Sequence, residues 1–161
     1  MVFFYACKIM SINLHSIVRG AINTINADET VYLMQSAGQK NVKGQLIASY
    51  AAPEKITAQV QSLGGDDLNV INDTERTERD RKFYLFAKTA TGTPPSGIIR
   101  PLGKTGDFIY RPADGCFWKI YNVSEDFSAA GWCLVLASQQ VDAPAPLKAA
   151  IQALKESGEI T

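Results

Sequence analysis

The sequence predicts a mainly β protein, a small antiparallel β-barrel or sandwich with one helix near each end. Three observations lead to this fold class. Short segments of alternating apolar and polar residues recur along the 161-residue chain, and turns rich in glycine and proline separate them. Helical spacing of apolar residues is confined to one segment near each end. The chain has no alternating βα pattern and no internal repeat, which argues against a parallel sheet or a solenoid.

The first helix is expected close to the start of the chain. Apolar residues recur at helical spacing over residues 14–25, and Ser11 or Asn13 can cap the beginning of the helix. Residues 1–10 contain an apolar run, but they lack a preceding basic residue and a small-residue cleavage site. We therefore expect no signal peptide and no membrane span, and we interpret this stretch as a leader, with translation beginning either there or at Met10.

The middle of the chain predicts a series of short strands separated by loops. The expected strands are residues 30–36, 45–50, 55–63, 82–88 and 97–100. Residues 37–44 are expected to be a loop between the first two strands. Residues 64–72 predict a turn or a short helix, and the proline- and glycine-rich residues 90–97 predict a long turn.

Residues 106–140 predict a three-stranded antiparallel meander that carries much of the core. Alternation over residues 108–111 and 116–123 flanks the turn residues 112–115, which is typical of a hairpin. Polar and small residues at 125–131 are expected to interrupt the pattern before a third strand at 132–140. Both tryptophans of the chain lie in this meander, and each buries a large apolar area.

Residues 141–161 predict a proline-bearing connector, 141–146, followed by an amphipathic helix that ends before Gly158. The helix carries its apolar stripe on Leu147, Ile151 and Leu154. Such a helix can fold back on its own sheet or dock on a neighbouring subunit, so these three residues are candidate partner-interface residues. The expected organisation is therefore one domain over residues 11–140, with the connector and helix of residues 141–161 appended to it.

The charge pattern gives no general attraction to nucleic acid or to an anionic membrane. Sixteen basic residues balance sixteen acidic residues, so the net charge is zero. The segment DTERTERDR at residues 73–81 alternates in sign. It is either an interaction loop that presents Arg76, Arg79 and Arg81 to an acidic partner or a solvated face that its own carboxylates neutralise, and the second interpretation is the simpler one.

Catalytic, metal and cofactor motifs are not recognisable, so we expect no enzyme activity, no cofactor and no metal. Residues 97–105 resemble a phosphate-binding loop, but five residues separate Gly97 from the Gly-Lys pair where that loop has four. A strand, rather than the helix that such a loop needs, is expected to follow. His15 is the single histidine and has no ligand or nucleophile spacing around it. An odd number of cysteines fits a reducing compartment. Cys116 and Cys133 lie on neighbouring predicted strands and could meet, but the simpler expectation is that they are small buried hydrophobes.

Four segments resemble small neck proteins of tailed phages and prophages, of the kind encoded between head and tail-sheath genes. They are LHSIVRGAIN (14–23), AQVQSLGGDDL (58–68), IIRPLGKTGDFI (98–109) and WKIYNVSEDFSAAGWCLVLASQ (118–139). The layout also resembles that of head-tail joining or stopper proteins. The resemblance covers most of residues 11–140 and excludes the leader and the last helix.

The resemblance implies a mechanical function in the virion. It implies a closed homo-oligomeric ring, expected to be six-fold, that lies between the portal-adaptor complex and the tail terminator or tail and lines the DNA channel. Weak nonspecific contact with packaged DNA would suffice there. Candidate ring-to-ring elements are the loop at 73–81, the turn at 90–97 and the terminal segments.

Other functions remain open at this stage. A tail terminator ring is a close variant of the stopper. An oligonucleotide-binding barrel is suggested weakly by Phe83, Tyr84 and Phe86 between Lys82 and Lys88, although core packing explains the same residues more simply. A hydrolase would need a site assembled from scattered residues around His15.

Overall fold

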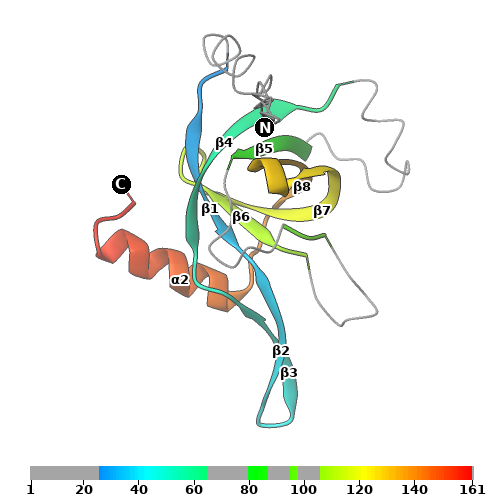
Figure 1. Ribbon diagram of the computed structural model, residues 1–161. Coiled ribbons are helices and arrows are strands. Elements are labelled where there is room, and N and C mark those ends of the chain that lie inside the picture. Colours follow the sequence, from blue (N-terminus) through cyan, green and yellow to red (C-terminus); the bar gives the residue numbers. More distant parts are fainter. Residues whose placement is uncertain (1–25, 65–79, 87–94, 98–105, 161) are drawn as a thin grey trace, which may run out of the picture.

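The computed structural model describes residues 26–64, 80–86, 95–97 and 106–160 (Figure 1). Within these ranges the chain forms eight strands, one short 3-10 helix and one α-helix. In chain order they are β1 (Glu29–Met34), β2 (Ser36–Val42), β3 (Gln45–Tyr50), β4 (Glu54–Ser62), β5 (Asp80–Phe86), β6 (Phe108–Arg111), β7 (Cys116–Phe127), η4 (Ser128–Ala130), β8 (Trp132–Gln140) and α2 (Ala145–Glu156).

Six of the strands close into an antiparallel barrel. Their order around the barrel is β1-β4-β5-β8-β7-β6, and β6 pairs with β1 to complete the circle. The expected barrel-or-sandwich fold is therefore confirmed as a barrel. The expected meander is also confirmed, because β6, β7 and β8 are consecutive antiparallel neighbours. Closure leaves no free edge in this sheet, so each of its strands has a partner on both sides.

Apolar side chains fill the barrel interior, as period-two alternation requires for a small closed barrel. The interior cluster consists of Val31, Leu33, Ile56, Ala58, Phe83, Leu85, Ile109, Trp118, Ile120, Cys133, Val135 and Ala137. The rings of Phe83 and Trp118 meet edge to face with their centroids 5.5 Å apart. The barrel is thus a packed unit, and its interior holds side chains.

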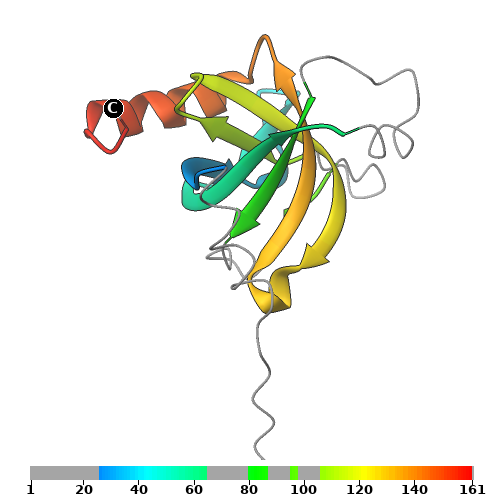
Figure 2. The same cartoon turned by 90° about the horizontal axis from the view of Figure 1, so that it is seen from above.

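A second apolar cluster covers the outer face of β1 and β6, where α2 packs (Figures 1 and 2). Tyr32, Met34, Phe108 and Tyr110 project outward from the two strands and are buried beneath α2. The C-terminal end of the helix is tied down as well, because the Tyr32 hydroxyl donates a hydrogen bond to the Glu159 carbonyl over 3.1 Å. Burial, and then the charge of Glu159, raises the pKa of Tyr32.

The β2–β3 hairpin, hereafter the arm, leaves the barrel between β1 and β4 and forms a two-stranded sheet of its own. Figure 1 shows it projecting away from the barrel, below the helix. Residues 37–44 were expected to be a loop, and that expectation is wrong: most of them form β2. The turn is reduced to Lys43 and Gly44, both with positive φ (51° and 84°), which is the signature of a type I′ turn.

Buried polar contacts attach the root of the arm to the barrel. The Asp107 carboxylate is 2% exposed and accepts hydrogen bonds from the backbone N–H of Ser36 over 2.7 Å and of Ser96 over 2.8 Å. Next to it, a Cβ on Gly106 would lie 2.2 Å from the Ile120 carbonyl oxygen, so only glycine fits there. On the other side of the root, the Tyr50 ring packs edge to face on Phe108, with centroids 5.6 Å apart.

Two further expectations can be compared with the described residues. The polar break expected over residues 125–131 is shorter than predicted, because β7 continues to Phe127 and only η4 and Gly131 separate it from β8. The amphipathic C-terminal helix is confirmed as α2. The N-terminal helix, the leader, His15, the strand expected at 97–100 and the GKT segment lie wholly or mainly outside the described residues.

Candidate interaction surfaces

The charged members of the predicted partner interface are only partly within the described chain. Arg76 and Arg79 lie outside the described residues. Arg81 belongs to β5, where it is half-buried and its Nη1 donates a hydrogen bond to the Asp80 carbonyl over 3.0 Å. The long turn expected at 90–97 is described only at its last three residues.

The apolar members of the predicted interface pack against their own chain. Leu147 is 1% exposed and Ile151 is 3% exposed, and Leu154 lies partly buried against the same cluster. The helix was expected either to fold back on the sheet of its own chain or to dock on a neighbouring subunit. In the structure it packs on the sheet of its own chain. The apolar stripe of α2 therefore stabilises the outer face of the barrel, and its opposite face is the part that remains exposed.

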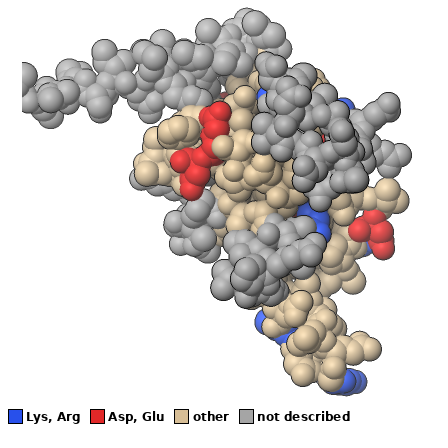
Figure 3. Space-filling view, turned by 90° about the vertical axis from the view of Figure 1, so that its right-hand side faces the viewer, with Lys and Arg blue, Asp and Glu red and all other residues tan. Residues whose placement is uncertain are grey.

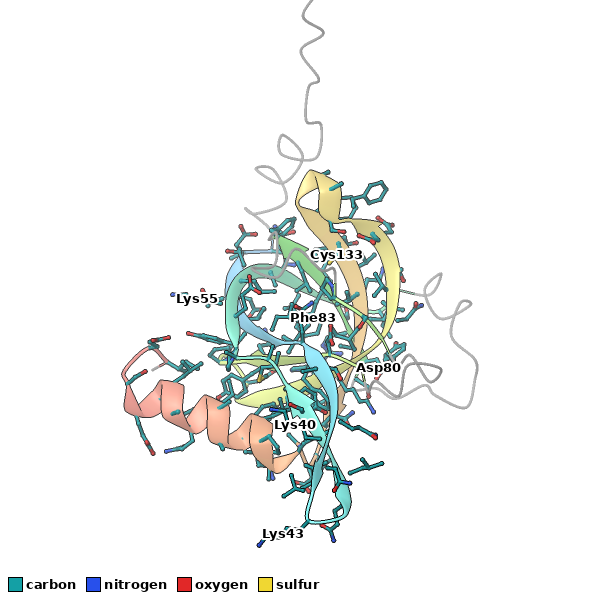
Figure 4. The ribbon with its side chains drawn as sticks, turned by 60° about the horizontal axis from the view of Figure 1, so that its bottom comes forward. Lys40, Lys43, Lys55, Asp80, Phe83 and Cys133 are labelled. Atoms are coloured by element: carbon teal, nitrogen blue, oxygen red, sulfur yellow. The ribbon has the colours of Figure 1, made fainter. Side chains whose placement is uncertain are left out.

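The arm exposes apolar side chains on both of its faces. Val42 is 47% exposed, Leu46 is 68% exposed and Ile47 is 41% exposed. Val42 and Ile47 are diagonal neighbours on one face, while Leu46, opposite Asn41, lies on the other face. The labelled Lys40 and Lys43 mark the arm in Figure 4, with Lys43 at its tip. A two-stranded hairpin with no cover on either face has little stability of its own.

A second exposed apolar feature lies where β7 turns into β8. The rings of Phe127 and Trp132 stack with centroids 4.7 Å apart, and Phe127 is 51% exposed. Glu125 and Asp126 are exposed beside them. We call these four residues the acidic tip. Hydrogen bonds from the hydroxyl and the backbone N–H of Ser128 lower the pKa of Asp126, which keeps this carboxylate charged.

An open groove of about 360 Å³ separates α2 from the β6–β7 hairpin. Cys116 lies on its wall, where its thiol donates a hydrogen bond to the Asp114 carbonyl and its sulfur accepts one from Gln139. Lys155 lies above the Tyr110 ring, with its Nζ 5.5 Å from the ring centroid. The groove thus gathers amides, lysines and a thiol that already have partners within the chain.

No group of three or more histidine, cysteine, aspartate or glutamate side chains is placed to hold a metal ion within residues 26–64, 80–86, 95–97 and 106–160. Over the same ranges, no helix has both the length and the apolar character needed to cross a bilayer. Cys116 and Cys133 are free thiols; Cys133 is buried, as expected, whereas Cys116 is only partly buried.

Sequence reasoning predicted β3 of the arm but missed β2, and it also missed the acidic tip. The arm does have a local signal: the pair Lys43-Gly44 stands between two six-residue segments of mixed polarity, and a two-residue turn ending in glycine is typical of a hairpin. Its first strand, β2, carries few apolar residues because neither face meets a core. The tip was hidden because Glu125 and Asp126 were interpreted as turn residues, whereas they belong to the last residues of β7.

The comparisons with known proteins leave the function open. No protein-family model matches the chain, and no curated protein matches it. Among solved structures, protein SF1141 from Shigella flexneri 2a is similar to it at 9% sequence identity and a TM-score of 0.48. The match covers 71% of this chain and 94% of that protein. At this score the likeness carries no argument about function.

Proposed function

We propose that this protein is a structural component of the head-tail connection of a tailed phage or prophage. In this proposal it acts as a stopper or joining ring between the portal-adaptor complex and the tail, lines the DNA channel and performs no chemical reaction. The proposal starts from the resemblance of four sequence segments to phage neck proteins. No family model matches the chain, so further support comes from the packing and the exposed side chains of the molecule.

The observation that carries the proposal is the combination of a rigid barrel with an arm that exposes apolar side chains. Apolar residues pack the barrel interior and α2 covers part of its outer face, which suits a building block that must keep its shape under load. The arm, in contrast, leaves Leu46 68% exposed in the isolated chain. Exposed apolar groups of this size on a projecting element favour contact with another protein.

Contact with packaged DNA needs no basic surface over the whole ring. Lys40 and Lys43 on the arm have exposed side chains, and residues 36–50 contain no acidic residue. Several copies of such an arm around a channel would supply a modest positive potential, and that is enough for weak contact with phosphates. The zero net charge of the chain is compatible with this local effect.

Two other functions are weighed against this proposal. A tail terminator ring would use the same barrel and the same kind of subunit contacts, so it remains the nearest alternative. An oligonucleotide-binding barrel is less well supported. Phe83, one of the three aromatic residues that suggested it, is 0% exposed in the barrel core, which leaves only the half-buried Tyr84 and Phe86 on β5 for stacking.

Reconstitution with the neighbouring proteins tests the proposal. The purified chain, mixed with the portal-adaptor and tail proteins encoded beside it, is expected to enter a symmetric ring visible by electron microscopy. A chain that stays monomeric in every such mixture would contradict it. Binding to single-stranded oligonucleotides that weakens steeply with salt, without ring formation, would favour the nucleic-acid module instead.

A further inference from the structure

Exposed large hydrophobic side chains are concentrated at two places in the described chain. Of the five such residues, Val42, Leu46 and Ile47 are on the arm, Phe127 is on the acidic tip, and Val141 follows β8. Phe127 is stacked on Trp132, so the tip presents a two-ring aromatic surface. Two exposed apolar sites on one small protein suggest either two partners or one contact repeated between copies.

The charges of the two sites are complementary. Residues 36–50, which form the arm, contain two lysines and no acidic residue. Residues 120–140, which include the acidic tip, contain Glu125 and Asp126 and no lysine or arginine. Each site therefore combines an apolar centre with charge of one sign, and the signs are opposite. This is the pattern of two surfaces that attract and orient each other.

One copy of the chain cannot bring its own two sites together. In Figure 4 the arm, marked by Lys43, and the end of the β7–β8 hairpin, which extends beyond Cys133, lie at opposite ends of the molecule. Figure 3 likewise shows basic side chains on the projecting lower part and an acidic group on the upper part of the same face, where some basic side chains are also visible. A contact between the sites must therefore join different molecules, and each molecule would offer one site to each of two neighbours.

We propose that the arm of one copy docks on the acidic tip of the next copy. Val42 and Ile47 would cover the Phe127–Trp132 pair, while Lys40, on the same face of the arm, approaches Glu125 and Asp126. The contact is head to tail, so it closes into a ring or extends as a filament. This proposal names the two surfaces that would hold the copies of the ring together. It rests on the proposed function only in that copies of the chain must contact one another.

Paired charge reversal provides the test. The arm variant Lys40→Glu/Lys43→Glu and the tip variant Glu125→Lys/Asp126→Lys are each expected to raise the Kd of self-association about tenfold or more in sedimentation velocity. An equimolar mixture of the two is expected to associate again, because both of its arm-to-tip contacts have opposite charges. The control Lys55→Glu/Lys148→Glu changes net charge as much as the arm variant does, on exposed lysines of β4 and α2, and it also breaks the ion pair of Lys148 with Asp142; it should associate like the wild type.

Site-directed cross-linking gives a second measurement that does not depend on charge variants. With Cys7 and Cys116 replaced by serine, Ile47→Cys and Phe127→Cys chains are expected to form a mixed disulfide dimer on oxidation. Neither should form a comparable dimer alone, and Val141→Cys, 89% exposed, serves as the control for random collision.

The outcomes separate this proposal from the ring function. A wild-type chain that is monomeric at every concentration and gives no arm-to-tip cross-link overturns the arm contact, while ring entry with neighbouring phage proteins can still succeed. A wild-type ring that survives both charge reversals also overturns it. Arm variants that self-associate normally but no longer bind a neighbouring phage protein would assign the arm to that partner.

Discussion

Two hairpins of this protein, the arm and the β6–β7 hairpin, differ in what surrounds them. The β6–β7 hairpin lies within the barrel, where β1 pairs with β6 and β8 pairs with β7. Its turn is braced by Arg111, which donates hydrogen bonds to Glu29 and Asp114, each over 2.9 Å. Burial works against the charge of Arg111, but these carboxylates outweigh it and raise the pKa of the guanidinium. The arm has no third strand, and both of its faces are exposed.

The difference shows where a hairpin obtains its stability. In the barrel, a residue such as Ile109 is 0% exposed and contributes through burial. On the arm, residues 39–47 are all exposed, so the hydrogen-bonded ladder and the turn must hold it without help from a core. The arm therefore has stability to gain from contact with another molecule, whereas the barrel hairpin does not.

The largest effect is expected from truncating matched aliphatic residues in the two hairpins. Ile109→Ala removes a fully buried side chain and leaves a cavity, so the free energy of unfolding should fall by about 2–5 kcal/mol. Leu46→Ala, on the arm, should change it by no more than about 0.5 kcal/mol. Urea unfolding followed by tryptophan fluorescence measures both. Equal losses would mean that the arm is part of the cooperative core.

The root of the arm can be loosened at Asp107. In Asp107→Asn, one carboxylate oxygen becomes an NH₂ group, so the backbone N–H of Ser36 or Ser96 loses its acceptor in a buried site; we expect a loss of about 2 kcal/mol. Hydrogen exchange of the affected amide should accelerate. The control is Asp114→Asn in the exposed turn of the other hairpin, which should cost less than about 1 kcal/mol. The same loss in both variants would argue against Asp107 as the anchor.

Cys133 in the barrel interior and Cys116 at the start of β7 allow the pH dependence of stability to be compared for a buried and a partly exposed thiol. Burial, and then the charge of Asp126, raises the pKa of Cys133 from the ordinary 9.0 to about 12. The unfolded chain therefore ionises first, so stability is fully present below pH 9 and decreases as the pH rises toward 12.

Unfolding at about pH 8 and about pH 10.5 should show this decrease in the wild type, and Cys133→Ala should show a smaller one. Tyr32, whose pKa is also raised, contributes equally to both chains. Cys116→Ala, in the half-exposed position at the start of β7, is the control for the loss of a thiol outside the barrel core. A Cys133→Ala chain with an unchanged pH dependence would contradict the assignment.

The smallest effect is expected at the turn of the arm. Lys43 adopts a φ of 51°, which a lysine tolerates less well than asparagine does, and the sequence Asn-Gly is preferred in type I′ turns. Lys43→Asn should therefore stabilise the arm by about 0.5 kcal/mol and slow hydrogen exchange of its ladder amides. Lys43→Ala removes the same charge without the turn preference and should not slow exchange. Faster exchange in Lys43→Asn would exclude this turn type.

The sequence alone was sufficient for the fold class, the β6–β7–β8 meander and the amphipathic helix. Each of these has local alternation or helical spacing that arises because one face meets a core. The second strand of the arm, β3, was predicted at residues 45–50, but residues 37–44, which form most of β2 and the turn, lacked that signal because neither face is buried, and they were interpreted as a loop. The candidate interface was predicted at the charged loop of residues 73–81 and at the apolar stripe of α2, because these segments have distinctive charge or apolar patterns in the sequence.

Only the tertiary structure decided between barrel and sandwich, because closure depends on the pairing of β6 with β1, whose residues are more than seventy positions apart in the chain. It also decided which apolar residues are left uncovered. Leu147 and Leu46 are both leucines in mixed polar surroundings, yet one is 1% exposed beneath its own barrel and the other is 68% exposed on the arm. Burial is a property of what packs nearby in space, and local sequence does not specify that neighbour.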